Sequence, residues 1–300
     1  MPGAARGGLG VVRMNEAANA SPLRQTFTPF MLALDSRVRG GNAQRIRLHL
    51  PFAPATCLRG GDATDLRAVA SLLDHAGGAA VYAALPDLKA TATLDLRMDL
   101  AGMPAAGQDV FVDAGCVAID DGSALVVGEA WGGEAGADAS ARTPIARMTG
   151  RFVVGLGPGQ RPGGDDRRAR EARAAAHLPV VPPRVDSFDE LLGGSTGGTV
   201  FTLPPAPWLV GSIALPALHG GAIAAGLMTA AQALAADPAT EAPGLRLKSL
   251  TVQYLRAAHL EETRFDARVV KRGGRALYLA VDATQRGGER GIATLQCLYA

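Results

Sequence analysis

Runs of alternating apolar and polar residues, mostly placed after a stretch of helical spacing, divide the sequence into two halves. The alternation is clearest in Thr-Leu-Asp-Leu-Arg-Met-Asp-Leu at 93–100, where every second side chain is apolar. A period of two predicts half-buried strands. The strands predicted in the first half are 43–51, 92–100, 109–119, 124–131 and 146–154. Turns such as Asp121-Gly122 separate them, so we expect neighbouring strands to pair as antiparallel hairpins.

An alanine-rich helix precedes the main run of strands in each half. In the first half it extends from about Thr64 to Leu85, and Pro86 then prevents its continuation. In the second half it runs from Gly220 to about Ala236. The strands predicted after this second helix are 245–256, 263–271, 275–284 and 290–299. The same order of elements therefore occurs twice.

The two halves are a duplication, because matching segments recur in the same order at a nearly constant spacing. Ile46-Arg-Leu-His-Leu-Pro corresponds to Val200-Phe-Thr-Leu-Pro-Pro. Asp74 and Met228 occupy matching places in the two helices, and strands 93–100 and 247–254 match at the same spacing. We therefore expect two related domains in one chain.

Composition places the domain boundaries between the repeats. We expect a disordered leader at 1–26, a first domain at 27–154, a linker at 155–186 and a second domain at 187–300. The linker begins with Gly-Leu-Gly-Pro-Gly-Gln-Arg-Pro-Gly-Gly, which is typical of flexible chain. Ser187 and Glu190 form the pattern of a capping box, which predicts a short helix at the start of the second domain.

Composition and charge exclude several classes of protein. The 300 residues carry a net charge of +2, which is too small for a nucleic-acid-binding surface. No stretch of about 20 apolar residues is present to span a membrane. The three cysteines have no metal-binding spacing and cannot all pair within the chain, so we expect a reducing, cytoplasmic setting and no metal site.

Candidate chemistry lies in the two helices. Asp74 is a lone carboxylate within the otherwise apolar first helix, on a face of mainly small side chains. The second helix lacks this acid and instead starts with His219-Gly220-Gly221. A backbone N–H at a helix start stabilises developing negative charge, and glycine lets a ligand approach it closely.

These features resemble the double hotdog thioesterases, and within them the PaaI-like acyl-CoA thioesterases. The resemblance covers Phe30 to Ala300 and rests on the repeat order, His-Gly-Gly at a helix start, the strand Thr-Val-Gln-Tyr-Leu-Arg and the turn Lys-Arg-Gly-Gly-Arg. It implies an α+β fold, a double hotdog in which each repeat wraps an antiparallel sheet around a long central helix. In the family, His-Gly-Gly and an Asp nine positions later share one helix, whereas here the two halves divide them.

The resemblance also implies how the halves combine. In related homodimers the glycine amide of one subunit faces the acid and hydroxyl of the other. Transferred to this chain, Gly220 would face Asp74 and Thr93, and these three are the predicted catalytic residues. The duplicate seam would bring Leu66 opposite Met228 and Leu247 without an acid, so we expect it to be inactive.

Further residues are expected to bind the substrate or to support the site. They are His219 and Gly221 at the helix start, and Lys271, Arg272 and Arg275, whose charges suit the phosphates of coenzyme A. The matching turn at Asp120-Asp121 would repel those phosphates. His75 follows Asp74 but points about 100° away on the helix, so we expect it to serve packing.

The predicted function is hydrolysis of an acyl-CoA thioester, with coenzyme A entering only as part of the substrate and no metal or organic cofactor. A hotdog-type enoyl-CoA hydratase or dehydratase and a non-catalytic acyl-CoA-binding protein are the alternatives. Neither nucleic acid nor membrane is an expected partner. Because single-hotdog relatives commonly form tetramers, we expect this tandem chain to form a homodimer, a pseudo-tetramer of hotdogs.

Overall fold

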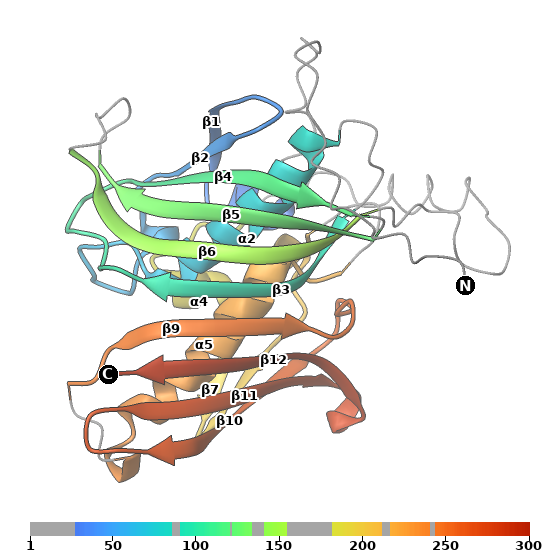
Figure 1. Ribbon diagram of the computed structural model, residues 1–300. Coiled ribbons are helices and arrows are strands. Elements are labelled where there is room, and N and C mark those ends of the chain that lie inside the picture. Colours follow the sequence, from blue (N-terminus) through green and yellow to red (C-terminus); the bar gives the residue numbers. More distant parts are fainter. Residues whose placement is uncertain are drawn as a thin grey trace, which may run out of the picture.

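The computed structural model describes residues 28–85, 91–120, 122–133, 141–154, 182–211, 217–240 and 244–300. Within these ranges the strands form one twelve-stranded antiparallel sheet in the order β1-β2-β4-β5-β6-β3-β9-β12-β11-β10-β8-β7. Helices α2 and α5 pack on the same side of this sheet and against each other (Figure 1). The predicted leader, and the linker up to residue 181, lie outside the described residues.

The first half contains the elements that surround α2. Their bounds are α1 Pro29–Ala33, β1 Arg37–Gly41, β2 Ile46–Leu50, η2 Pro54–Thr56, α2 Leu66–Ala84, β3 Thr91–Leu100, β4 Val110–Ile119, β5 Ser123–Gly132 and β6 Thr143–Val154. The Asp65 side chain caps α2 by accepting a hydrogen bond from the Arg67 N–H. Small residues let the sheet approach closely, because a Cβ at Gly77 would lie 2.2 Å from Cζ of Phe152.

The second half repeats this arrangement around α5. Its elements are α4 Phe188–Leu192, β7 Ser195–Gly197, β8 Val200–Leu203, η4 Pro207–Leu209, α5 Gly220–Ala236, η5 Pro238–Thr240, β9 Leu247–Tyr254, β10 Thr263–Arg272, β11 Leu277–Gln285, η6 Arg286–Gly288 and β12 Arg290–Tyr299. A Cβ at Gly226 would lie 2.4 Å from Cζ of Phe265, so this helix also depends on glycine for close packing.

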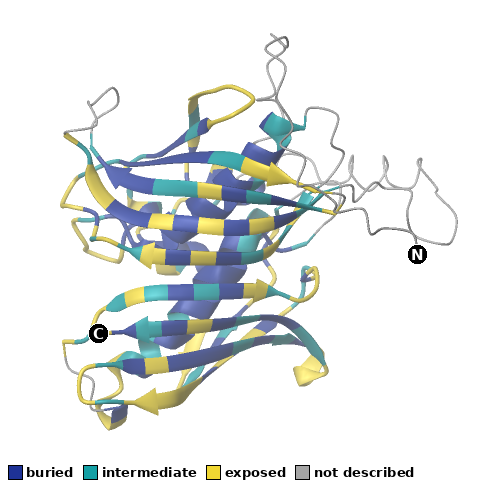
Figure 2. Cartoon of the chain, in the orientation of Figure 1, coloured by how far each residue is buried: buried dark blue, intermediate teal, exposed yellow. Residues whose placement is uncertain are grey.

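The two halves share one core. Strand β3 pairs with β9, from Asp95 opposite Gln253 to Asp99 opposite Ser249. Beneath this junction α2 crosses α5, and the Ser71 hydroxyl donates a hydrogen bond of 3.0 Å to the carbonyl of Gly221. The buried apolar side chains continue from one half into the other without interruption, as the dark bands in Figure 2 show. The seam between the halves is therefore buried, like the interior of either half.

The short helix that opens each half packs against the other half. Helix α1 lies on η4, where the Phe30 N–H donates to the carbonyl of Val210 at 3.3 Å. Helix α4 lies on η2, where the Phe188 N–H donates to the carbonyl of Cys57 at 2.7 Å. The two repeats thus exchange their first helices.

The predicted order of helices and strands agrees with these elements, apart from details at the edges. Strands β1, β7 and β8 were absent from the predicted set. Strands β1 and β7 are short and exposed and lack apolar alternation, and β8 has only four residues. In the predicted capping box, the Ser187 hydroxyl does accept from the Glu190 N–H at 3.2 Å. The Glu190 carboxylate, however, accepts from the Asp186 N–H rather than from that of Ser187.

Candidate functional site

Asp74 lies where α2 meets the start of α5. Its carboxylate is 4% exposed and accepts a hydrogen bond of 2.8 Å from the Thr93 hydroxyl on β3. A Cβ at Gly220 would lie 2.6 Å from Oδ2 of Asp74, so only glycine fits opposite the acid. The structure therefore brings together the acid and hydroxyl of the first half and the helix start of the second.

The environment of Asp74 changes its acidity. Burial raises the pKa of Asp74 from 3.8 to about 6, because desolvation disfavours the charged form. Hydrogen bonds from the Thr93 hydroxyl and the Gly221 N–H act in the opposite direction and lower this pKa. The carboxylate is consequently ionised near neutral pH and is more basic than an exposed aspartate, as general-base catalysis requires.

The start of α5 presents a backbone donor beside this acid. His219 is the N-cap residue, and its Nδ1 accepts from the Gly221 N–H at 2.9 Å. The Gly220 N–H has no hydrogen-bond partner among the described residues. On the other side of the same residue, the Tyr254 hydroxyl of β9 donates to the Gly220 carbonyl at 3.0 Å. The Gly220 N–H is thus held at a helix N-terminus, where an oxyanion is stabilised.

His219 is a neutral part of the site. Burial lowers the pKa of His219 well below its ordinary value of 6.5, and His75 lowers it further. Its Nδ1 lies 3.5 Å from Oδ2 of Asp74, but a neutral imidazole that already accepts from Gly221 forms no ion pair there. Its Nε2 lies 3.3 Å from Nδ1 of His75. The ring of Phe30, from the exchanged helix α1, covers His219 at 5.4 Å between centroids.

The duplicate seam is filled by an arginine. Leu66 and Met228 are both buried at this seam, which does not contain Asp74. The Arg67 guanidinium occupies the region beside the start of α2, donating to Asp65 at 2.6 Å and to Thr229 at 2.9 Å. It also pairs with Asp189 of the exchanged helix α4 at 2.8 Å. Both carboxylates of this cluster are thus paired with the Arg67 guanidinium.

The predicted phosphate-binding residues lie far from Asp74. Lys271, Arg272 and Arg275 are exposed at the turn between β10 and β11. The Arg272 guanidinium donates to the carbonyl of Thr240, which follows the C-terminal end of α5. A helix of 17 residues spans about 25 Å, and Gly220 is at its other end. The structure therefore does not place this turn at the site around Asp74.

Three side chains at the site were absent from the predicted set of catalytic and binding residues. They are Ser71, His75 and Tyr254. Their common signal in the sequence is asymmetry, because the matching positions in the other repeat hold Ala225, Thr229 and Leu100. A difference between matching positions of the two repeats is therefore the sequence signal for these three side chains.

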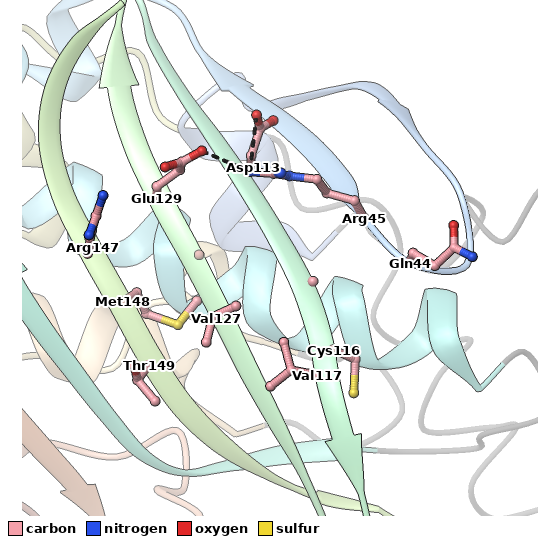
Figure 3. Close-up of a pocket in the computed structure, with 12 residues that line it drawn as sticks. Gln44, Arg45, Asp113, Cys116, Val117, Val127, Glu129, Arg147, Met148 and Thr149 are labelled. Carbon is pink, nitrogen blue, oxygen red and sulfur yellow. Dashed lines mark hydrogen bonds and ion pairs between the residues drawn. The ribbon is translucent and has the colours of Figure 1, made fainter. Parts of the chain in front are cut away.

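A surface groove lies elsewhere, on the face of β4, β5 and β6 that points away from α2 (Figure 3). Its volume is about 420 Å³, and it contains none of the predicted catalytic residues. Arg45 at its rim pairs with Glu129 at 2.8 Å and approaches Asp113 at 3.7 Å. Among the described residues, no cluster of three or more His, Cys, Asp or Glu side chains is suited to hold a metal ion. No helix in the same ranges is both long and apolar enough to cross a membrane.

Comparison with known proteins identifies the class of domain. Residues 205–300 match the family model of the acyl-CoA thioesterase N-terminal domain. No curated protein sequence matches the chain. Among solved structures, the chain is similar to the tesB protein of Mycobacterium avium subs paratuberculosis, with a TM-score of 0.57, 14% identity, and coverage of 91% of this chain and 99% of that one.

Two further structures share this architecture. The 12:0-ACP thioesterase from Umbellularia californica has a TM-score of 0.55 and 11% identity, over 85% of this chain and 94% of that one. A protein with a hotdog fold from Alicyclobacillus acidocaldarius has a TM-score of 0.53 and 12% identity, over 91% and 98%. These likenesses show the hotdog fold with its large antiparallel sheet. The likenesses confirm the predicted hotdog fold, and the family match confirms an acyl-CoA thioesterase domain at residues 205–300; the PaaI-like affiliation stays a prediction.

Proposed function

We propose that this chain is a double hotdog that hydrolyses acyl-CoA thioesters at one composite site between its repeats. Residues 27–154 and 187–300 would be the two hotdog domains, each with its long helix, α2 or α5, at the centre. The observation that carries this proposal is the approach of Gly220 from one repeat to Asp74 and Thr93 from the other. A donor for the oxyanion and a base for water thereby meet at one place.

The proposed chemistry uses these groups in a defined order. The thioester carbonyl oxygen accepts from the Gly220 N–H, and the Asp74 carboxylate removes a proton from a water molecule that attacks the carbonyl carbon. The new carbon–oxygen bond forms, the carbon–sulfur bond breaks, and the proton passes to the departing thiolate. A direct attack by Asp74, with water then cleaving the acyl-enzyme, is the second route open to the same geometry.

Labelled water detects a covalent route in which the anhydride is cleaved at the Asp74 carboxyl carbon. In a single turnover with enzyme in excess, performed in ¹⁸O-water, attack by water places the label in the first molecule of acid released. Attack by Asp74 forms a mixed anhydride; when water then cleaves it at the Asp74 carboxyl carbon, the released acid is unlabelled in that turnover and the label appears in Asp74. We expect labelled acid, because Thr93 and Gly221 both donate to the carboxylate and reduce its nucleophilicity.

The geometry is less suited to a hydratase. Such an enzyme needs a histidine that exchanges protons with the substrate. Here Nδ1 of His219 accepts from Gly221, and Nε2 lies against His75, so both ring nitrogens are engaged within the protein. A non-catalytic acyl-CoA-binding protein would leave the raised pKa of Asp74 without a use.

A thiol-release assay tests the proposal. Purified protein is incubated with acyl-CoAs of increasing chain length while free thiol is followed with a chromogenic reagent. We expect turnover that Asp74→Asn reduces by a factor of 100 or more, on the order of a lost base. Asp95→Asn, the same change on β3, is the matched control and should retain turnover. Acyl-CoA binding without thiol release would support the binding-protein alternative instead.

The remaining features of this proposal concern partners and setting. We propose a cytoplasmic enzyme that needs no metal or organic cofactor, binds no nucleic acid and assembles as a homodimer. We keep the prediction that Lys271, Arg272 and Arg275 contact the phosphates of coenzyme A, which form the end of the substrate distant from the thioester. Sedimentation at micromolar concentration tests the assembly, and a monomer alone would contradict it.

A further inference from the structure

His75 directly follows Asp74, but the proposed mechanism does not use it. Its ring is buried and lies 5.4 Å from that of His219, with an angle of 42° between the planes. Nδ1 of His75 and Nε2 of His219 are 3.3 Å apart. The two residues come from different repeats, so this contact exists only at the seam that contains the acid.

The hydrogen bonds of the cluster fix which nitrogen of His219 carries its proton. Nδ1 of His219 accepts from the Gly221 N–H, so Nδ1 holds a lone pair. In a neutral imidazole the proton is then on Nε2, which faces His75. His75 can accept this proton only if its own Nδ1 is unprotonated. In that state His75 favours the tautomer of His219 that carries its proton on Nε2.

This tautomer matters to Asp74 because the two groups share a neighbour. Oδ2 of Asp74 lies 3.5 Å from the same Nδ1 of His219, and the Gly221 N–H interacts with both. With a lone pair on Nδ1, His219 accepts a share of the hydrogen bond from the Gly221 N–H and donates no hydrogen bond to the carboxylate. With a proton on Nδ1, His219 would donate to Asp74 and release the Gly221 N–H to it as well. The carboxylate would then be a weaker base.

We propose that His75 is a positioning residue, which acts through the tautomer of His219 to keep the Asp74 carboxylate short of hydrogen-bond donors. This inference rests on the proposed function and extends it to the control of the base. Besides His75 and His219, the titratable group shown to interact with Asp74 in the described structure is Tyr254 of β9, whose hydroxyl is turned to the Gly220 carbonyl. Strand β3 contributes only the hydroxyl of Thr93.

Two variants separate this role from simple packing. In His75→Phe the ring is kept but the acceptor is lost, so His219 is free to place its proton on Nδ1. The acid limb of the kcat/KM profile should then move to lower pH by about one unit, because the carboxylate gains donors. His75→Gln retains an acceptor oxygen and should keep the original profile. An unshifted acid limb in His75→Phe, or equal shifts in both variants, would overturn the proposal.

Nuclear magnetic resonance tests the same point without turnover. Two-bond ¹H–¹⁵N correlations of histidine-labelled protein report which ring nitrogen is protonated, and a His219→Asn variant assigns the signals. We expect the Nε2–H tautomer of His219 in the unaltered protein and in His75→Gln, and the Nδ1–H tautomer in His75→Phe. A protein without thioesterase activity would refute the proposed function but still answer this question. The Nδ1–H tautomer in the unaltered protein would refute the role of His75 even in an active enzyme.

Discussion

Replacing Asp74 by Asn should stabilise the protein at neutral pH while it removes activity. Burial raises the pKa of this carboxyl from 3.8 to about 6, a difference of about two units. At about 1.4 kcal/mol per unit, holding the ionised form inside the fold costs about 3 kcal/mol. Asn carries no such cost. Its NH₂ group, however, cannot accept the hydrogen bond that Thr93 or Gly221 donates to the carboxylate, and the loss of that hydrogen bond lowers stability by about 1–2 kcal/mol. The net gain expected at pH 7.5 is about 1–2 kcal/mol.

The stability gained by Asp74→Asn should depend on pH. Because the pKa is raised in the folded state, the native protein binds the proton more tightly than the unfolded chain. The stability of the unaltered protein therefore falls as pH rises from about 4 to about 6, and the full penalty is present above that range. The advantage of Asp74→Asn should accordingly disappear at pH 4, where the aspartate is protonated in the folded protein.

Urea unfolding at pH 4, 5, 6 and 7.5 measures this difference, with Asp95→Asn as the matched control. ΔΔG is the free energy of unfolding of Asp74→Asn minus that of the unaltered protein. It should be about 3 kcal/mol larger at pH 7.5 than at pH 4. A constant difference across the four pH values would show that Asp74 does not titrate in the folded protein as its burial indicates. The explanation of its basicity would then be wrong.

Three further substitutions test other parts of the site. Thr93→Val removes a donor that lowers the pKa of Asp74, so the acid limb of kcat/KM should move above pH 6 and turnover should fall; an unchanged profile would contradict the hydrogen bond. Met228→Ala should cost about 2–5 kcal/mol of stability in chemical denaturation and leave kcat unchanged, because the side chain is buried at the seam without an acid. Replacing Lys271 and Arg275 together by Ala should raise KM for acyl-CoA but not for the N-acetylcysteamine thioester, which lacks the nucleotide; equal KM values before and after would exclude phosphate binding there.

The sequence was sufficient for the elements and for the meeting of Asp74 with Gly220. Periodicity locates helices and strands because burial on one face imposes it. Which residues face each other across the seam was implied by the resemblance to hotdog homodimers, transferred to the two repeats. The contact of His75 with His219 could not be predicted in this way. Helical spacing places His75 on a different face of α2 from Asp74. It does not show that the start of α5 contacts both faces.

Arg67 illustrates a second limit. A basic residue near the start of a helix is ordinarily exposed, yet here Asp65, Thr229 and Asp189 satisfy it inside the protein. Asp189 is far away in sequence and arrives with an exchanged helix. Neither composition nor spacing indicates such an exchange, because each short helix would satisfy the same pattern on its own repeat.

The exchange of α1 and α4 has a consequence for the order in which the chain is made. The first repeat leaves the ribosome before Phe188 and Asp189 exist, so Arg67 then lacks the ring at 5.3 Å and the carboxylate that cover it in the finished protein. Phe30 in turn has no η4 to rest on until residues 207–209 have been synthesised. The nascent chain therefore cannot complete its N-terminal domain before the first part of the second repeat, up to Leu209, has been synthesised.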